Sequence, residues 1–180
     1  MAWIETLARL DLDATAGSNR ANGGRACRFV FAWASRLGDG WFWYALAAAL
    51  LLVEGGAAIV TVATMAAAGL AGTAIYTLLK RGIRRPRPSE AHSGLILTVA
   101  PLDRFSFPSG HTLHAIAFSV VVTSHAPQLG WLVWPFAALV AASRLVLGLH
   151  YPSDVIVGGT LGATIAWIAV AVVSSSGVPL

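Results

Sequence analysis

The sequence predicts an all-α protein, a bundle of helices that crosses a lipid bilayer five or six times. Of its 180 residues, 57% are hydrophobic and 11% are charged, and the mean hydropathy of +0.71 is unusual for a soluble domain. The apolar residues gather into five long stretches, and a spanning helix needs about 20 such residues. Proline, glycine or polar residues separate the stretches, which predicts helices joined by turns. We therefore expect one polytopic transmembrane bundle.

The five expected spans are residues 41–53, 57–79, 111–124, 131–147 and 154–173. The first and third are short, so we expect them to extend into their flanks or to end at a polar cavity. Four tryptophans lie near span ends, where interfacial aromatic residues are common. They are Trp41, Trp43, Trp131 and Trp134. In the last span, Gly158 and Gly162 predict close packing against a neighbouring helix.

We expect residues 1–40 to form an interfacial N-terminal segment and residues 41–180 to form the transmembrane core. Within the segment, residues 27–37 are apolar but too short to cross a bilayer, and they include Arg28 and Arg36. The aromatic side chains of this stretch can enter the interface while the arginines stay in water. A sixth span is the alternative for it.

The composition excludes several kinds of site and partner. Cys27 is the only cysteine, so the chain can form neither an intramolecular disulfide nor a cysteine-based metal site. The net charge is +4, but the basic residues flank or interrupt apolar spans. We therefore expect the lipid bilayer, and anionic lipid in particular, as the partner rather than nucleic acid. The sequence does not indicate which oligomeric state the protein adopts.

Three short polar clusters interrupt the apolar sequence, at residues 80–88, 108–111 and 143–154. Charged groups inside a membrane protein are costly and usually functional. The second span exits at the first cluster, the third span enters at the second cluster, and the last two spans exit and enter at the third. Counting spans therefore places all three clusters on one face of the membrane, where we expect a single site.

The first cluster offers five cations. They are Lys80, Arg81, Arg84, Arg85 and Arg87. A planar guanidinium can bond two phosphate oxygens at once, whereas lysine supplies a mobile point charge. A phosphate site is one interpretation of this cluster, and a juxtamembrane patch for anionic lipid headgroups is the other.

In the second cluster, Ser109 lies where an N-cap would begin the next helix, and Pro108 and Gly110 shape the turn. A helix N-terminus with free backbone N–H groups binds anions, and His111 beside it can give or take a proton near neutral pH. His114 lies one turn further on. We place His114 outside the site, as a buried and hydrogen-bonded histidine.

The third cluster places Arg144 before His150, and Asp154 four residues after that histidine. A carboxylate bonded to one ring nitrogen fixes the tautomer and leaves the other nitrogen free to attack phosphorus. Asp154 can also cap the last helix, and the two roles can coexist. His111 and His114 have helical spacing but no third ligand, and cations surround them, so we expect no metal site and no cofactor.

Taken together, the three clusters resemble the three-part signature of the type 2 phosphatidic acid phosphatase (PAP2) superfamily. The matching residues are Lys80, Arg87, Pro88, Pro108, Ser109, Gly110, His111, Ser143, Arg144, His150 and Asp154. The resemblance implies a PAP2-like helical fold and a metal-independent phosphatase with a phosphohistidine intermediate. It covers the region from Lys80 to Asp154, and three ordered motifs are more specific than any one of them.

The resemblance also implies a role for each motif residue. His150 is the expected nucleophile, Asp154 orients it, and His111 is the acid for the leaving oxygen. The expected phosphate-binding residues are Lys80, Arg87, Ser109, Gly110 and Arg144. The other cations of the first cluster are left to lipid headgroups; these are Arg81, Arg84 and Arg85.

Membrane members of this family act on phosphatidate, phosphatidylglycerol phosphate or polyprenyl diphosphates such as undecaprenyl diphosphate, so the resemblance implies a lipid phosphate or diphosphate as substrate. One alternative is a relative that transfers the group to another lipid instead of water. A second is a non-catalytic protein that binds or transports anionic lipid, which would need the cations but not His150 with Asp154. A vanadate-dependent peroxidase shares the pocket, but such peroxidases are soluble and the spans argue against one.

We expect a multi-pass protein of the cell (inner) membrane. With five spans, the N-terminal arginines share the face of the site, and the loops on the opposite face contain no lysine or arginine. The positive-inside rule then places the site in the cytoplasm. The resemblance favours the other side, because many bacterial members present the site outside the cytoplasm. The distribution of basic residues leads us to expect the cytoplasmic side.

Overall fold

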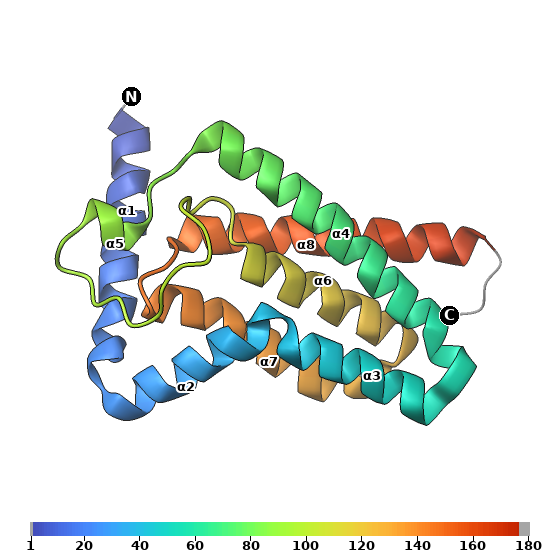
Figure 1. Ribbon diagram of the computed structural model, residues 1–180. Helices are drawn as coiled ribbons and strands as arrows, with labels where there is room; N and C mark the ends of the chain where they lie inside the picture. The colour runs from blue at the N-terminus through green and yellow to red at the C-terminus, as the bar shows by residue number, and fades with distance from the viewer. Residues whose placement is uncertain (1, 177–180) are drawn as a thin grey trace.

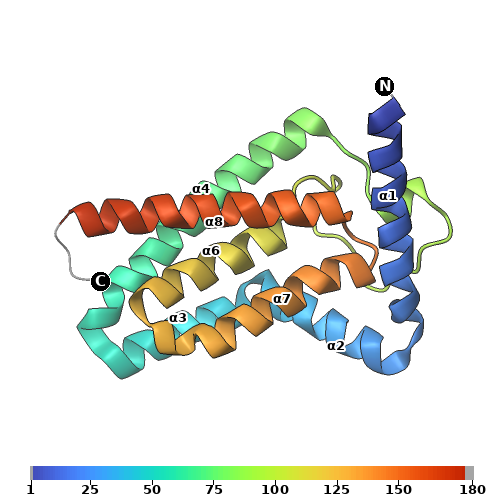
Figure 2. The ribbon, with the colours of Figure 1, turned by 180° about the vertical axis from the view of Figure 1, so that it is seen from behind.

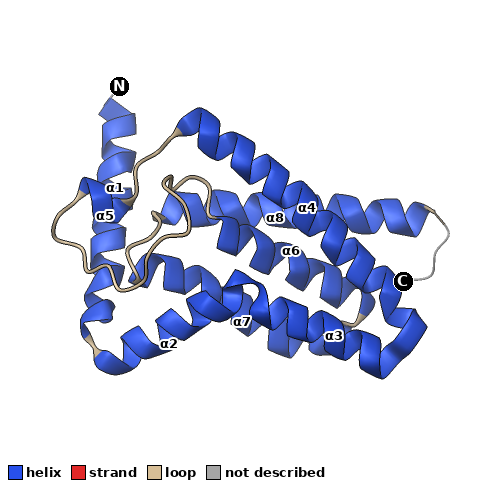
Figure 3. Cartoon of the chain, viewed as in Figure 1, coloured by secondary structure: helices blue, strands red, loops and turns tan. Residues whose placement is uncertain are grey.

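The computed structural model describes residues 2–176, and every regular element in this part of the chain is a helix (Figure 3). The long helices are α1 (Ala2–Asn19), α2 (Arg25–Arg36), α3 (Phe42–Glu54), α4 (Ala58–Ile83), α6 (Gly110–His125), α7 (Gly130–Val146) and α8 (Pro152–Ser175). A single turn, α5 (Pro88–Ala91), lies between α4 and α6. The predicted all-α fold is confirmed, and the last five long helices coincide with the five expected spans.

Within the described residues, three helical stretches are long and apolar enough to cross a membrane, namely Arg25–Ala91, Pro127–Val146 and Pro152–Ser175. The first stretch contains α2, α3 and α4 in succession. Helix α6 has 16 residues, fewer than the roughly 20 that span a bilayer unaided. The number of crossings, five or six, stays a prediction.

Helix α6 lies in the middle of the bundle and packs against α4, α7 and α8 (Figures 1 and 2). A methyl group added at Gly158 or Gly162 of α8 would collide with the carbonyl oxygen of Ser109 or Leu113. The predicted close packing through these two glycines is therefore confirmed, and its partner is α6. The backbone N–H of Ser109 donates to the carbonyl oxygen of Asp154 at 3.0 Å, which joins the starts of the two helices.

An aromatic cluster joins α3 to α6 and α7. The rings of Phe42 and Phe136 stack at 3.8 Å between centroids, and Trp43 meets Phe118 edge-on at 5.3 Å. Trp43 is only 2% exposed, so its expected place at the interface is wrong: the first turn of α3 faces the core. Trp41 is 74% exposed, as expected of an interfacial side chain.

The N-terminal helices lie against the end of the bundle where the polar clusters are found (Figure 1). Helix α2 continues into α3 through a kinked turn, Leu37–Trp41, and packs against α7. Helix α1 ends at the buried Asn19, whose Nδ2 donates to the carbonyl oxygens of Ile96 and Val146 at 3.0 and 2.8 Å. These bonds tie α1 to the long loop and to the end of α7. The expected place of the N-terminal segment, residues 1–40, at the membrane interface stays a prediction.

The long loop between α4 and α6 begins where Arg84 adopts a left-handed conformation (φ 51°) and ends α4. The backbone N–H of Ser106 donates to the carbonyl oxygen of Arg85 at 2.9 Å, so the two ends of the loop lie side by side. The loop therefore folds back over the end of the bundle, beside α1 (Figure 1). It carries Arg87 and Asp103, which lie at the same cavity as Gly110 and His111 at the start of α6.

Candidate active site

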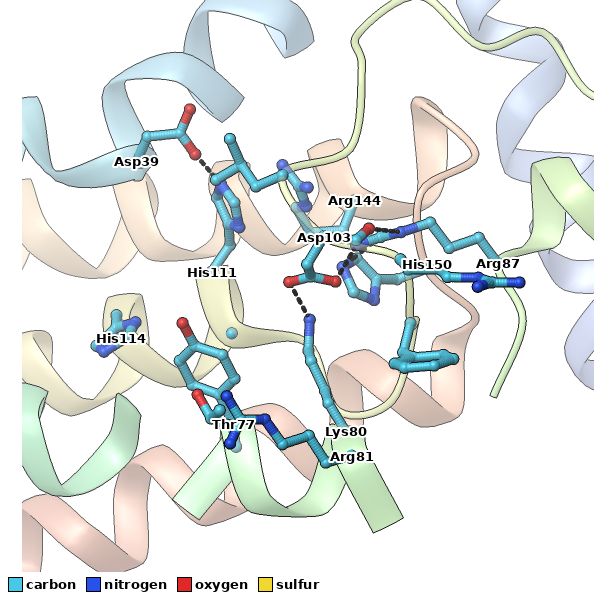
Figure 4. A pocket seen from close by; sticks show the side chains of 16 residues that line it. Asp39, Thr77, Lys80, Arg81, Arg87, Asp103, His111, His114, Arg144 and His150 are labelled. Carbon is cyan, nitrogen blue, oxygen red and sulfur yellow. Dashed lines mark hydrogen bonds and ion pairs between the residues drawn. The ribbon is translucent and has the colours of Figure 1, made fainter. Parts of the chain in front are cut away.

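The three polar clusters meet around a cavity of about 540 Å³ at this end of the bundle (Figure 4). Each cluster contributes to its wall. The lining residues of the motifs are Lys80, Arg87, Gly110, His111, Arg144 and His150. Helix α4 supplies the lysine, the long loop Arg87, the start of α6 the glycine and its histidine, and the end of α7 with the following loop supplies Arg144 and His150. Segments far apart in the sequence thus share one cationic cavity.

His150 lies in the short loop between α7 and α8. Its side chain is 1% exposed, and its Nε2 lies 3.3 Å from Nη1 of Arg87. Its backbone N–H donates to the carbonyl oxygen of Arg144 at 3.1 Å. Gly148 makes this turn possible, because its φ of 69° is a conformation that side chains disfavour. The loop thereby fixes a buried imidazole at the cavity wall.

Asp154 lies behind His150 and is fully buried. Its Oδ2 accepts the backbone N–H of Tyr151 at 2.9 Å, and its Oδ1 accepts Nη1 of Arg85 at 2.8 Å. Nδ1 of His150 is 3.6 Å from Oδ2, which is an electrostatic contact rather than a hydrogen bond. The carboxylate thus caps the first turn of α8 and faces the histidine, so the structure is compatible with both expected roles.

Three buried cations surround the imidazole: Lys80, Arg87 and Arg144 have 7%, 2% and 2% exposed fractions. The Asp103 carboxylate bridges two of them, accepting Nζ of Lys80 at 2.6 Å and Nη2 of Arg87 at 2.8 Å. Arg144 donates Nη1 to Oγ of Ser35, while its buried Nε has no partner within the described part of the chain. The cavity therefore holds more positive charge than the protein itself neutralises.

Burial lowers the pKa of the His150 imidazole well below its usual range, and the positive charges of Arg144, Arg87 and Lys80 lower it further. The ring is therefore neutral near pH 7 and keeps a lone pair. Burial disfavours the charged form of Asp103, but the hydrogen bond and charge of Lys80, followed by those of Arg87, outweigh it and lower the pKa of this carboxyl. Asp103 is ionised and acts as the counter-ion of the cavity.

The start of α6 differs in part from the expected anion site. Gly110 and His111 line the cavity, but Ser109 does not. Its Oγ forms a hydrogen bond with Oγ1 of Thr112 at 3.0 Å, and its backbone N–H donates to the carbonyl oxygen of Asp154. Ser109 therefore joins α6 to α8 in this structure. His114 also lines the cavity, and its Nε2 lies 3.2 Å from both Oγ1 of Thr73 and the carbonyl oxygen of Gly69.

The sequence model of the PAP2 superfamily matches residues 56–177, which include all three clusters. The chain belongs to the PAP2 superfamily. Two solved structures share the fold. One is the crystal structure of Aquifex aeolicus LpxE, with a TM-score of 0.78 and 26% identity, covering 90% of this chain and 95% of that one. The other is a transmembrane PAP2 type phosphatidylglycerolphosphate phosphatase from Bacillus subtilis, with a TM-score of 0.74 and 20% identity over 94% and 87% of the two chains.

Curated relatives of this PAP2 protein include the decaprenylphosphoryl-5-phosphoribose phosphatase of Mycolicibacterium smegmatis, 41% identical over 118 residues. The matched part is 64% of this chain and 62% of that protein. The undecaprenyl-diphosphatase BcrC of Bacillus subtilis is 38% identical over 49% of this chain and 45% of its own length. The chain thus spans about half to three fifths of these relatives. Together with the transmembrane PAP2 fold, the apolar helices make it a multi-pass membrane protein.

The motifs of the PAP2 superfamily did not reveal four further residues that hold the site together. They are Asp11, Ser35, Asp39 and Asp103. Ser35 bonds to Arg144, and Asp39 contacts Nε2 of His111 through Oδ1. For Asp11, Ser35 and Asp39, the only signal in the sequence was span counting, which placed the N-terminal segment on the same face as the clusters.

Arg85 corrects one expectation, because it does not serve lipid headgroups alone. Its guanidinium bonds to Asp11 at 2.7 Å and to Asp154 at 2.8 Å, and it stacks on the Tyr151 ring at 3.9 Å. Arg85 is therefore the ion-pair partner of the carboxylate beside His150. Arg81, by contrast, is exposed, although it too lines the cavity.

Proposed function

We propose that this chain is a membrane phosphatase that removes phosphate from a lipid phosphate or diphosphate through a phosphohistidine intermediate. The observation that carries the proposal is the neutral, buried His150 in the wall of a cavity with three buried cations. A pocket that only bound an anionic headgroup would need the cations, but not a histidine paired with a buried carboxylate. A site that transfers a phosphoryl group through a phosphohistidine uses both.

In the proposed first step, Nε2 of His150 attacks phosphorus while Lys80, Arg87 and Arg144 stabilise the negative charge on the phosphoryl oxygens. The bond from phosphorus to the leaving oxygen breaks, and His111 gives that oxygen a proton. Asp154 steadies the positive charge that develops on the phosphorylated ring. These are the roles that the family resemblance implies, and the grouping of the side chains at one cavity supports them.

In the second step, water attacks the phosphohistidine and His111 takes its proton. The bond between phosphorus and Nε2 breaks, which releases phosphate and restores the neutral imidazole. The Asp103 carboxylate that now bridges Lys80 and Arg87 has to give way to the phosphoryl oxygens of the substrate. Its side chain is 41% exposed and comes from the long loop, so it can move without unpacking the bundle.

A lipid substrate is supported by an apolar cleft of about 450 Å³ between α3 and α4. The cleft shares Gly38, Asp39 and His114 with the cationic cavity. A lipid tail in the cleft would therefore lead directly to a headgroup in the cavity. The names of the relatives, which act on decaprenyl and undecaprenyl lipids, favour a polyprenyl phosphate or diphosphate.

The decisive assay measures inorganic phosphate released from a panel of polyprenyl diphosphate, phosphatidate and phosphatidylglycerol phosphate by the full chain in detergent. We expect release that resists EDTA and is inhibited by vanadate, together with acid-labile phosphate on His150. Strong inhibition by EDTA would overturn the proposed mechanism. Phosphate found on an acceptor lipid instead of in water would favour the transferase alternative.

We also propose that the chain lies in the inner membrane with the site facing the cytoplasm, because the basic residues gather at the site end. The opposite turns, residues 55–57 and 126–129, contain no lysine or arginine. Cysteines introduced at the exposed Glu90 and Gln128 in a Cys27→Ser background test this with a membrane-impermeant thiol reagent on intact cells. We expect labelling at position 128 alone. Labelling at position 90 alone would reverse the orientation.

A further inference from the structure

Asp39 lies on the kinked turn between α2 and α3, outside the region matched by the PAP2 superfamily. Its Oδ1 contacts Nε2 of His111, and both side chains line the cationic cavity (Figure 4). The carboxylate is 30% exposed and the imidazole 12%. No motif residue occupies this position, and the family signature assigns it no role.

The local sequence holds Asp39 in place. A methyl group at Gly38 would lie 2.9 Å from Cγ2 of Val140, so a larger residue would force the turn or this valine of α7 to shift. Gly40 has a φ of 131°, which a residue with a side chain rarely adopts. The two glycines therefore let the backbone turn sharply on both sides of Asp39. The turn directs one carboxylate at one histidine.

The other carboxylates of the site are already engaged by cations. Asp103 bonds to Lys80 and Arg87, and Asp154 bonds to Arg85. Within the described part of the chain, Asp39 is therefore the carboxylate that contacts the histidine expected to move the proton. Asp103 thus contacts cations expected to bind phosphate, Asp154 faces the expected nucleophile, and Asp39 contacts the expected general acid.

The pair lies on the leaving-group side of the cavity. Asp39 borders both the cationic cavity and the apolar cleft between α3 and α4. With the phosphoryl group among the cations and the tail in the cleft, the oxygen that joins them lies at this junction. That oxygen is the atom that needs a proton when its bond to phosphorus breaks.

We infer that Asp39 is a positioning residue for the acid His111, and this inference rests on the proposed function. The carboxylate accepts the Nε2–H of the imidazolium and fixes the ring. The other ring nitrogen then gives its proton to the leaving oxygen, which keeps the electron pair of the broken bond. The neutral ring later recovers a proton from the attacking water.

Two phosphate monoesters test the inference because their leaving groups differ in their need for a proton. A long-chain alkyl phosphate must lose an alkoxide and depends on the acid, whereas p-nitrophenyl phosphate loses a stable phenolate. For Asp39→Asn in the full chain, we expect kcat for the alkyl ester to fall about 10- to 100-fold, below the full contribution of a general acid. For the aryl ester we expect a fall of less than about 3-fold.

Asp103→Asn is the matched control, since it neutralises a carboxylate of the same cavity that contacts cations instead of His111. Its effect should be similar on both esters. Asp39→Asn in a His111→Ala background should add little selective loss, because the acid is already gone. Activity on the aryl ester also shows that each variant is folded.

Equal losses of Asp39→Asn on the two esters, or no loss on either, would overturn the inference. Neither result would touch the proposed function if the wild-type chain hydrolyses the esters and His150→Ala does not. A wild-type chain that hydrolyses neither ester nor any lipid phosphate would instead overturn the proposed function. The two failures are therefore distinguishable in one set of assays.

Discussion

The site is built from two regions of unlike character. The region matched by the PAP2 superfamily supplies the cations, the histidines and Asp154. The N-terminal helices supply Asp11, Ser35 and Asp39, and each of these contacts a cluster residue: Asp11 meets Arg85 and Ser153, Ser35 meets Arg144, and Asp39 meets His111. The difference teaches that residues able to perform the chemistry are held in position by a segment without a motif. Changes to the cations and histidines of the first region should reduce turnover more than changes to the supporting residues of the second.

The largest expected effect comes from His150→Ala. Removing the proposed nucleophile leaves no atom to accept the phosphoryl group, so phosphate release should fall on the order of 10³-fold or more. The melting temperature in detergent and the elution volume should show a folded protein. His92→Ala, a histidine in the long loop that does not line the cavity, is the matched control and should keep its activity. Near-normal turnover by His150→Ala would end the assignment.

The pH dependence of the wild-type chain sharpens the same point. An ordinary histidine with a pKa of 6.5 would lose its lone pair as the pH falls through that value. The pKa of His150 is lowered well below 6.5 by burial and by the neighbouring cations, so the nucleophile stays neutral across this range. We therefore expect the rate of phosphoenzyme formation not to fall as the pH is lowered through 6.5. Any loss of substrate turnover near pH 6.5 should not be shared by this step.

A second, smaller effect compares Arg144 with the serine that holds it. Arg144→Lys keeps a charge but removes the planar guanidinium from a buried position, and we expect kcat to fall about 10²-fold. Ser35→Ala removes one neutral hydrogen-bond partner, worth about 1 kcal/mol, so kcat should fall about 3- to 10-fold. In the double variant the serine change should cost less than it does alone. Strictly additive effects would show that Ser35 does not act through Arg144.

The fold could be predicted from the sequence because its signals are local. Five apolar stretches, their proline and glycine breaks, and the Gly158 and Gly162 pair each predict one helix or one contact. Trp43 was misplaced because a tryptophan near a span end looks the same in sequence whether it faces lipid or core. Only the packing of α3 against Phe118 and Phe136 decides between the two.

The site was predictable only where its residues carry a motif. The clusters predicted which segments would come together, since spans that alternate in direction bring their ends to one face. The partners of those residues depend on where α1 and α2 pack, and no sequence period records that packing. Asp11 is separated from Ser153 by most of the chain, yet it accepts the backbone N–H of that residue at 2.9 Å. Such contacts follow from tertiary structure alone.

The smallest expected effect concerns Asp103, which belongs to the matched region but is not one of its motif residues. Its carboxylate occupies the two cations, Lys80 and Arg87, that the proposed function assigns to phosphate. Asp103→Asn removes a competing negative charge, so vanadate and phosphate should inhibit the enzyme about 3- to 5-fold more tightly, because a partly exposed ion pair contributes about 1 kcal/mol or less. Inhibition constants measured at two salt concentrations would check this.

The opposite result would be equally informative about the comparison between the two regions. If Asp103 holds Lys80 and Arg87 in place for the substrate, as Ser35 holds Arg144, its removal should weaken inhibition by both anions. Glu90→Gln, an exposed acid of α5 that does not line the cavity, controls for a general change in the field of the loop. Tighter inhibition in Asp103→Asn but not in Glu90→Gln would identify Asp103 as an internal occupant of the phosphate position. Weaker inhibition would place it with the residues that hold the cations.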